Sequence, residues 1–338
     1  MQTKDRISQS EIKNENTLAI FTQIAASNGI SRAEISEKTG LSLMTVGKVA
    51  DKLSHEGIIT QAKPATGNAG RRAGMLTLSE KNFVLTLDIS TKIFRASALD
   101  LFQQTIDSVS YEYNDSLFPE DNLIIFFRES GSLLMKHLME KKMLGTGICI
   151  PGRYDPENDI IYASRIKELE GIKISETMKK AIGFTPDKIV NSLDAAAKSA
   201  MEALSQEVPR CAIYLSLDRE ISGCVAFDGE IFERDADFGA LICKNGMALK
   251  RITDEISDEE ELAKNISFAL MPLIHVLSPD IIFITTGKRI YSEWFSSFLK
   301  KELCTKEKTP EILFDNSKGN RAEMGLSHLI SCEVIKDL

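Results

Sequence analysis

The sequence predicts an α/β protein with a small helical domain at its N-terminus and a two-lobed body behind it. Apolar residues recur at helical spacing over about the first 60 positions, alternating strand-like runs begin at Lys81, and one order of strands and helix occurs twice afterwards. A chain of 338 residues with 43% hydrophobic content is long enough for two or three cores. We expect domains at 1–80, 81–190 and 191–338, with the C-terminal helix returning to the first lobe.

Charge is unevenly distributed along the chain. Residues 1–80 carry 10 Lys and Arg against 8 Asp and Glu, a net charge of +2, whereas residues 81–338 carry 31 against 41, a net charge of −10. Only the N-terminal segment can approach a polyanion without strong repulsion. No stretch approaches the roughly 20 apolar residues of a membrane span, so we expect a cytoplasmic protein that contacts no membrane.

Cysteine and histidine spacing predicts no metal site and no disulfide framework. The six cysteines are scattered without Cys-x-x-Cys spacing, and the four histidines form no pair at ligand spacing. We therefore expect buried thiols, no metal and no cofactor.

The first predicted helix spans about residues 14–28 and ends at Asn28-Gly29. The segment before Lys13 is polar and is either frayed or an additional helix. The side chains expected to face the core are Leu18, Phe21, Ile24 and Ala25.

A second helix is predicted over about residues 32–38. Ser31 is a preferred N-cap residue, and Glu34 follows at the spacing of a capping box. Gly40 is free to adopt the left-handed conformation that ends a helix. The chain then turns into a third helix.

The third helix is capped by Ser42 and has two distinct faces. Its predicted inner face is formed by Val46, Val49, Ala50 and Leu53. Its predicted outer face is formed by Met44, Thr45, Lys48 and Lys52. Gly47 costs about 1 kcal/mol relative to Ala in a helix interior, so it indicates either close packing or close approach of DNA.

Two alternating segments follow, at 58–63 and 75–78, and predict a β-hairpin across a tip rich in Pro, Gly and Asn. Arg71 and Arg72 lie in this hairpin and suit phosphates or a narrow minor groove, although a solvated charged loop is the alternative. Three helices and such a hairpin indicate a winged helix-turn-helix. The predicted DNA contacts are Ser42, Met44, Thr45, Lys48, Lys52, Arg71 and Arg72.

The body shows the repeated pattern. Its first copy consists of strands at 83–88, 93–99 and 106–113, a helix at 119–142 and a strand at 147–150. Its second copy consists of strands at 211–217, 223–227 and 230–232, a helix at 258–277 and a strand at 281–285. Helices at 291–302 and 321–330 close the chain. Two lobes with a ligand cleft between them are therefore expected.

Several motifs together resemble the ROK family of bacterial sugar-responsive repressors and sugar kinases. Gly70-Arg71-Arg72 is similar to the wing of its regulators, and 87–92 stands where the family has Asp-x-Gly-x-Thr. Gly147 to Gly152 matches its Gly-x-Gly-x-Pro-Gly, and 213–217 matches the strand before its second phosphate loop. The resemblance implies a winged helix-turn-helix followed by a two-lobed actin/hexokinase-like body with duplicated mixed-sheet units.

The chain departs from this family where the kinases perform their chemistry. Asp218, Arg219 and Glu220 replace a glycine-rich phosphate turn, and Ser90 replaces a glycine of the first phosphate loop. Ser192 occupies the general-base position, and a serine hydroxyl is a poor base without a partner. Residues 239–243 lack the family's sugar-binding Glu and zinc-ligating His, so the sequence predicts neither an enzyme nor a metal site.

The predicted ligand-binding residues are Arg165, Asn191 and Ser192. Arg165 stands where the family has a sugar-contacting Asn, and it suits a carboxylate or phosphate, or else is an ordinary surface arginine. Leu169 replaces a tryptophan.

We expect a DNA-binding regulator of the repressor type. Its dimer or higher homo-oligomer is expected to bind a palindromic operator, and its body to sense a sugar or sugar derivative. The alternatives are a dimer whose body is only a scaffold and, with least support, an ATP-dependent sugar kinase.

Overall fold

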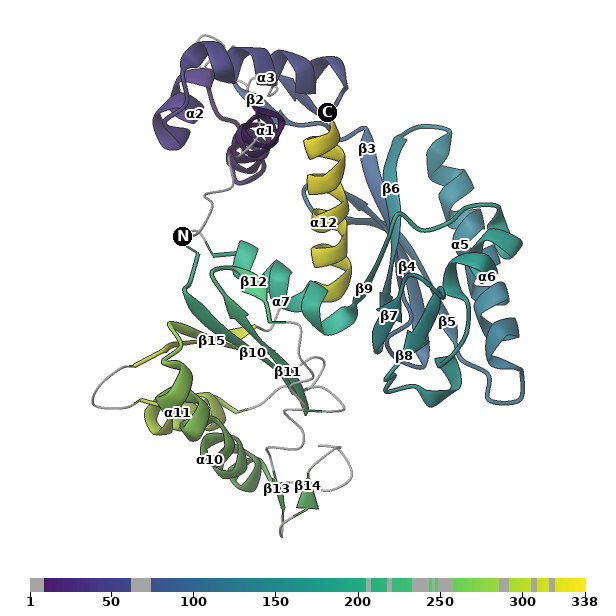
Figure 1. The fold of residues 1–338 in the computed structure, drawn as a ribbon, viewed down its shortest axis with the longest axis vertical. Helices are drawn as coiled ribbons and strands as arrows, with labels where there is room; N and C mark the ends of the chain where they lie inside the picture. Colours follow the sequence, from purple (N-terminus) through teal and green to yellow (C-terminus); the bar gives the residue numbers. More distant parts are fainter. Residues whose placement is uncertain are drawn as a thin grey trace, which may run out of the picture. The chain divides into compact units, whose positions relative to one another are not determined.

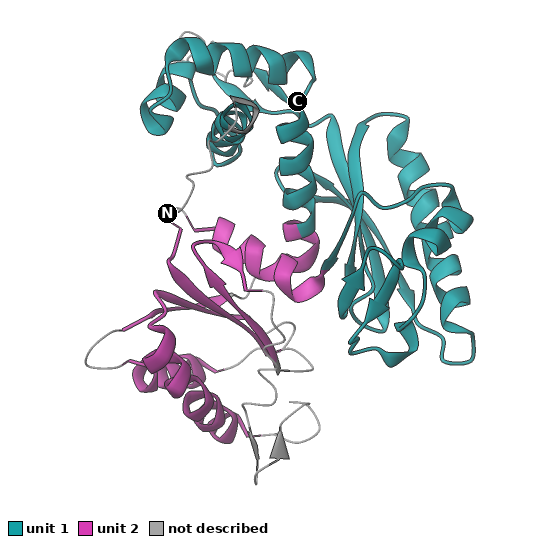
Figure 2. Ribbon diagram, viewed as in Figure 1, with its two compact units in different colours: residues 1–190, 326–338 teal, residues 191–325 magenta. Residues whose placement is uncertain are grey.

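The computed structural model describes residues 9–61, 74–204, 208–217, 221–232, 243–244, 247–248, 258–285, 292–304, 309–315 and 320–338. These residues form two compact units (Figure 2). Unit 1 comprises 1–190 with 326–338, and unit 2 comprises 191–325. The domain limits expected from the sequence, at residues 80 and 190, stay predictions.

The N-terminal part of unit 1, termed the head, contains three helices and a two-stranded sheet (Figure 1). The helices are α1 (Gln9–Ala25), α2 (Arg32–Thr39) and α3 (Leu43–His55). Strand β1 (Ile59–Gln61) pairs antiparallel with β2 (Leu76–Leu78). This is the order of elements in a winged helix-turn-helix.

Local capping signals fix the ends of α2 as the sequence predicts. The hydroxyl oxygen of Ser31 accepts a hydrogen bond from the Glu34 amide at 3.2 Å, and the Glu34 carboxylate accepts one from the Ser31 amide at 2.9 Å. Gly40 has a φ of 69° and closes the helix. The predicted capping box and the left-handed glycine are therefore confirmed.

The predicted ends of the first helix are wrong. Helix α1 begins at Gln9 and stops at Ala25 instead of continuing to Asn28. It stops early because the backbone of Ile30 is already extended and exchanges two hydrogen bonds with Leu76 of the hairpin, at 3.0 and 2.8 Å. Pairing with a distant strand therefore sets this helix end.

Unit 1 contains a five-stranded mixed sheet in the order β5-β4-β3-β6-β9. Its strands are β3 (Asn82–Asp88), β4 (Ile93–Asp100), β5 (Thr105–Glu112), β6 (Lys142–Ile150) and β9 (Lys188–Asn191). Strand β4 runs antiparallel to both β3 and β5, and β6 runs parallel to β3. Side chains of helices α5 (Pro119–Leu138) and α6 (Ile174–Ile182) pack in the core of this sheet, which includes Phe94 and Phe126.

The predicted boundary between helix 119–142 and strand 147–150 is wrong. Helix α5 ends at Leu138 and β6 begins at Lys142. Residues 139–142 favour helix by local propensity, but Lys142 and Met143 pair with Asn82 and Phe83 of β3. Sheet pairing overrides propensity here.

Smaller elements of unit 1 surround the start of α6. They are β7 (Arg153–Asp155), β8 (Ile160–Tyr162) and the 3-10 turn η1 (Lys167–Leu169). Asp159 bonds this region together, because its carboxylate accepts hydrogen bonds from the Tyr154 hydroxyl at 2.7 Å and from the amides of Ser175 and Glu176 at 3.0 Å. The sequence did not predict these elements.

Unit 2 repeats the sheet of unit 1 with the order β12-β11-β10-β15-β16. Its strands are β10 (Cys211–Leu217), β11 (Ile221–Phe227), β12 (Glu230–Ile231), β15 (Ile281–Thr285) and β16 (Glu311–Asp315). Its helices are α7 (Ser192–Glu202), α10 (Glu259–Leu277) and α11 (Glu293–Glu302), and β13 (Cys243–Lys244) pairs with β14 (Met247–Ala248). The predicted duplication is confirmed.

The last helix, α12 (Arg321–Asp337), continues seven residues beyond its predicted end. A Cβ added at Gly145 would lie 2.6 Å from Ile330, and one added at Gly147 would lie 2.7 Å from Leu326, so these glycines of β6 admit the helix. Near its C-terminal end, Ile335 belongs to the core of the head. Figure 1 shows α12 in yellow, ending beside the head.

Direct hydrogen bonds also join the head to the sheet of unit 1. The side-chain amide nitrogen (Nδ2) of Asn82 donates to the carbonyl oxygen of Gly57 at 2.7 Å, and the ammonium of Lys142 donates to the carbonyl oxygen of Glu56 at 3.4 Å. Among the described helices, none combines the length and apolar character needed to cross a membrane.

Candidate nucleic-acid interface

Helix α3 has one buried face and one exposed face, as predicted. Val46, Ala50 and Leu53 are buried in the core of the head. Lys48 and Lys52 are exposed, and Thr45 is partly exposed. A helix held in this way presents its outer side chains to a groove of DNA without loss of the core.

The N-terminus of α3 is capped by side-chain hydroxyl groups. The Ser42 hydroxyl oxygen accepts a hydrogen bond from the Thr45 amide at 3.1 Å, and the hydroxyl groups of the two residues lie 2.9 Å apart. This cap fixes the first turn, so both side chains have a structural role alongside the DNA contact predicted for them.

Two large apolar side chains protrude from this first turn. Met44 is 71% exposed and Leu43 is 58% exposed. Apolar groups at this end of a recognition helix suit the methyl group of thymine in the major groove. Leu43 was not predicted as a contact, although its place directly after the N-cap residue was a usable signal.

A pair of lysines extends the exposed face onto α1. The ammonium of Lys13 lies beside that of Lys52, and this neighbour, as a hydrogen-bonding group and a like charge, lowers the pKa of Lys52. Two neighbouring cations repel one another and are relieved by an anion, which suits a backbone phosphate. Lys13 is far from Lys52 in the sequence and was not predicted as a contact.

The acidic residue on α3 is neutralised within the head. The carboxylate of Asp51 lies 2.5 Å from the guanidinium of Arg32 on α2, and both side chains are largely exposed. This pairing reduces the repulsion that Asp51 would exert on phosphates.

Gly47 lies on the same helix, one turn after Leu43 and Met44. A Cβ added at this position meets no atom of the described residues within 4 Å. Packing within the head therefore does not require glycine, and the close approach of DNA at this position stays a prediction.

Both wing arginines, Arg71 and Arg72, lie outside the described residues, as does Gly70. The described base of the hairpin ends where Gln61 pairs with Leu76. Their role in DNA binding stays a prediction.

The kinase-like phosphate loops are described only in part. In the first, the carboxylate of Asp88 accepts a hydrogen bond from the Ser90 amide at 2.9 Å, so the turn is closed on itself. In the second, residues 218–220 lie outside the described residues, as do 239–242 and the side chain of Cys243. No cluster of His, Cys, Asp or Glu among the described residues is arranged to hold a metal ion.

The predicted ligand-binding residues fall in different units. Asn191 and Ser192 begin unit 2, and Arg165 is an exposed residue of unit 1. The side-chain oxygen of Asn191 accepts a hydrogen bond from the Leu193 amide at 2.8 Å and caps α7, while Ser192 is 6% exposed. Leu169 is part of the core of unit 1.

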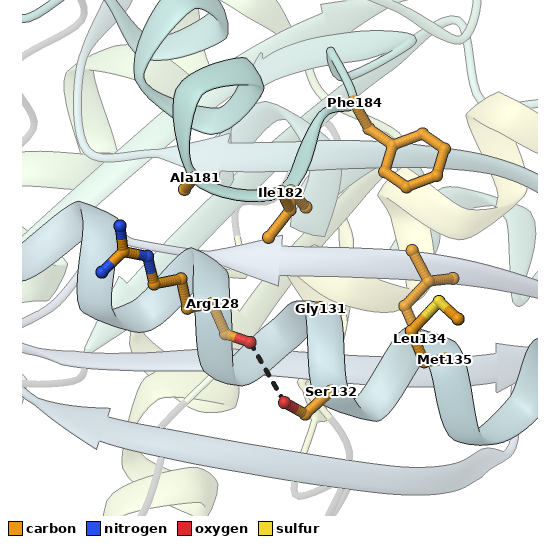
Figure 3. A pocket seen from close by; sticks show the side chains of 8 residues that line it. All are labelled: Arg128, Gly131, Ser132, Leu134, Met135, Ala181, Ile182 and Phe184. Atoms are coloured by element: carbon orange, nitrogen blue, oxygen red, sulfur yellow. Dashed lines mark hydrogen bonds between the residues drawn. The ribbon is translucent and has the colours of Figure 1, made fainter.

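A shallow pocket of about 510 Å³ lies between α5 and α6 in unit 1 (Figure 3). Figure 3 shows Arg128 at one end and Phe184 with Met135 at the other. The helices meet closely at Gly131, where an added Cβ would lie 2.8 Å from Ile182. None of the predicted ligand-binding residues lines this pocket.

Two proteins with similar sequences are named as repressors. The xylose repressor of Bacillus subtilis (strain 168) is 24% identical over 260 residues, which cover 72% of this chain and 66% of the repressor. The xylose repressor of Bacillus spizizenii is 23% identical with the same coverage. The chain thus spans about two thirds of the length of these relatives, and no family model matches it.

Solved structures share the fold. A ROK family transcriptional regulator, described as a homologue of the E. coli MLC protein, has a TM-score of 0.70 at 14% identity and covers 96% of this chain and 97% of its own. The ROK hexokinase of Thermus thermophilus has a TM-score of 0.54 at 15% identity and covers 75% of this chain and 99% of its own. The regulator therefore matches a larger share of the chain than the kinase does. In its fold the chain is thus similar to these ROK family proteins, and in its sequence it is similar to the two xylose repressors.

Proposed function

We propose that this protein is a DNA-binding transcriptional repressor that responds to a sugar and has no kinase activity. The observation that carries the proposal is the exposed face of α3, where the apolar first turn adjoins Lys48 and the paired Lys13 and Lys52. The proposed DNA contacts are Ser42, Met44, Thr45, Lys48, Lys52, Arg71 and Arg72.

The regulator type is supported by the comparisons. The related proteins are named xylose repressors, and the ROK regulator matches the head as well as the body by its coverage of the chain. The departures from the kinase pattern at Ser90, Ser192 and 218–220 support the absence of phosphoryl transfer. Xylose is the first effector to test, with Arg165, Asn191 and Ser192 as its proposed contacts.

A homodimer fits this function because a two-fold protein reads a palindromic operator with two heads. An effector must bind the DNA-competent and DNA-incompetent states with different affinity, since otherwise it shifts neither population. The same requirement makes sugar binding and release from DNA measurable together.

The test is the affinity of the full chain for DNA upstream of its own gene, measured by fluorescence anisotropy with and without xylose. Lys48→Ala is expected to weaken binding and to reduce its dependence on salt, whereas Lys179→Ala on α6 removes the same charge from outside the head and is expected to leave both unchanged. Equal affinity for operator and unrelated DNA, or phosphorylation of a sugar, would refute the proposal.

A scaffold without a ligand is the second candidate, and one observation favours it. Asn191, the residue retained from the sugar site of the family, uses its side-chain oxygen to cap α7. Thermal unfolding across sugars, sugar acids and sugar phosphates separates the two candidates, because a ligand that binds only the folded chain raises its midpoint. No shift with any compound would support the scaffold.

A further inference from the structure

A second cavity lies within unit 1, at the joint between the head and the body. It has a volume of about 320 Å³. Three segments line it: the end of α1, the turn between β4 and β5, and the middle of α12. The lining residues used below are Ala25, Phe102, Gln103, Ser327, His328 and Ser331.

The lining is suited to a small neutral molecule with several hydroxyl groups. It combines side-chain amides, hydroxyls and an imidazole with the rings of Phe21 and Phe102. Amides and hydroxyls exchange hydrogen bonds with sugar hydroxyls, and apolar rings pack on the C–H faces of a sugar. Of the described residues that line this cavity, only His328 can carry a charge.

Two serines of α12 contribute to the cavity wall. Ser327 is 1% exposed, and its carbonyl oxygen accepts a hydrogen bond from the Ser331 hydroxyl at 2.8 Å. Polar groups in a cavity wall can exchange hydrogen bonds with the hydroxyl groups of a bound ligand.

The opposite wall is held in an unusual conformation. Gln103 has a φ of 62°, a region that non-glycine residues rarely adopt. Its side-chain amide lies 3.4 Å from the imidazole of His328, whose other nitrogen lies 3.0 Å from the thiol of Cys332. This turn thus brings the side-chain amide of Gln103 against His328 of α12 in the cavity wall.

We propose that this joint cavity binds a neutral monosaccharide or polyol. Such a ligand would contact α1 of the head together with the β4–β5 turn and α12 of the body. Its affinity would therefore depend on the position of the head relative to the rest of unit 1. Its effect on DNA affinity rests on the proposed function, whereas its binding does not. The cavity is separate from the ligand-binding residues proposed above, none of which lines it.

The experiment is hydrogen exchange of the full chain with D-xylose, D-glucose or myo-inositol, and with glucose 6-phosphate as a charged comparison. A neutral ligand is expected to slow exchange at residues 100–104 and in α12, and the phosphate ester is expected to do so less. Because exchange is read without DNA, this result is independent of whether the chain is a repressor.

Two variants test the site without weakening the fold. Gln103→Gly relieves the left-handed conformation, so it is expected to be at least as stable as wild type, yet to bind the neutral ligand about tenfold more weakly for lack of the amide. Ala25→Met fills the cavity and is expected to abolish binding there. The matched control is Ala26→Met, which adds the same side chain at the next, exposed position that does not line the cavity.

Protection that is present in wild type and in Ala26→Met, and lost in Gln103→Gly and Ala25→Met, supports the proposal. Absence of protection at residues 100–104 with all three neutral compounds at millimolar concentration overturns it. Protection that survives in Ala25→Met also overturns it, because the ligand would then lie elsewhere.

Discussion

Replacement of Gly47 by alanine separates the stability of the head from its binding of DNA. Because an added Cβ meets nothing within 4 Å among the described residues, alanine fits this position without repacking. Alanine is favoured over glycine in a helix interior by about 1 kcal/mol. The free energy of unfolding of the head is therefore expected to rise by about 0.5–1 kcal/mol.

DNA binding is expected to change in the opposite direction. The new methyl group points from the α3 surface next to Leu43 and Met44, where the proposed interface brings the groove close. A steric conflict of about 1–3 kcal/mol weakens binding by about 5- to 150-fold. A gain in stability with a loss of affinity is not produced by a general loss of structure.

The assay combines urea unfolding, followed by circular dichroism, with anisotropy titration of the operator. Ser54→Ala is the matched control, since it raises helix propensity on the exposed surface of α3 without adding an atom. A more stable Gly47→Ala protein with wild-type DNA affinity would remove this face of α3 from the interface. A less stable one would refute the packing argument.

Three further outcomes are expected. Lys13→Ala should weaken DNA binding and reduce the slope of log affinity against log salt by about one, and an unchanged slope would show that Lys13 meets no phosphate. Gly325→Ala should cost about 3 kcal/mol or more in chemical unfolding, because the added Cβ would lie 1.8 Å from the carbonyl oxygen of Ala195, and wild-type stability would contradict this contact. Burial raises the pKa of Asp159, but its hydrogen bonds outweigh burial and leave the pKa below the ordinary value. The stabilisation from the Asp159 carboxylate is therefore complete above its unfolded pKa of about 4 and is lost as the pH falls through the folded pKa. Asp159→Asn should lower the free energy of unfolding by on the order of 1–2 kcal/mol at neutral pH and by progressively less in acid. A loss that does not depend on pH in urea unfolding would contradict this.

Elements of the head were predictable where their signals are local. Ser31, Glu34 and Gly40 specify both ends of α2 by hydrogen bonds within a few residues. The end of α1 was missed because it depends on Ile30 pairing with Leu76, and no property of the nearby sequence reports that contact. The same limit applies to the start of β6.

Strands β10 and β15 were predicted with their observed bounds, because buried strands read as short apolar runs with breakers on both sides. Strand β16 and helix α7 were not predicted as elements. Helix α7 is rich in Ala and Ser and contains few of the large apolar side chains from which the other helices were predicted, even though most of it is buried.

The candidate DNA interface was predictable in its helical part only. Helical spacing distinguished Lys48 and Lys52 from the buried residues of α3, and it identified the helix that carries them. It did not identify Lys13, which lies beside Lys52 only because α1 packs against α3 in the head. Contacts contributed by a second element need the tertiary fold.

The place of Ile335 in the head has a consequence for how the chain folds during synthesis. The three helices of the head leave the ribosome first, but their core includes a side chain from the far end of α12. Nascent domains generally fold as units in the order in which they emerge. Here the core of the head can be completed only after Ile335 has been translated. Chains that stall earlier therefore carry a head whose core lacks one of its side chains.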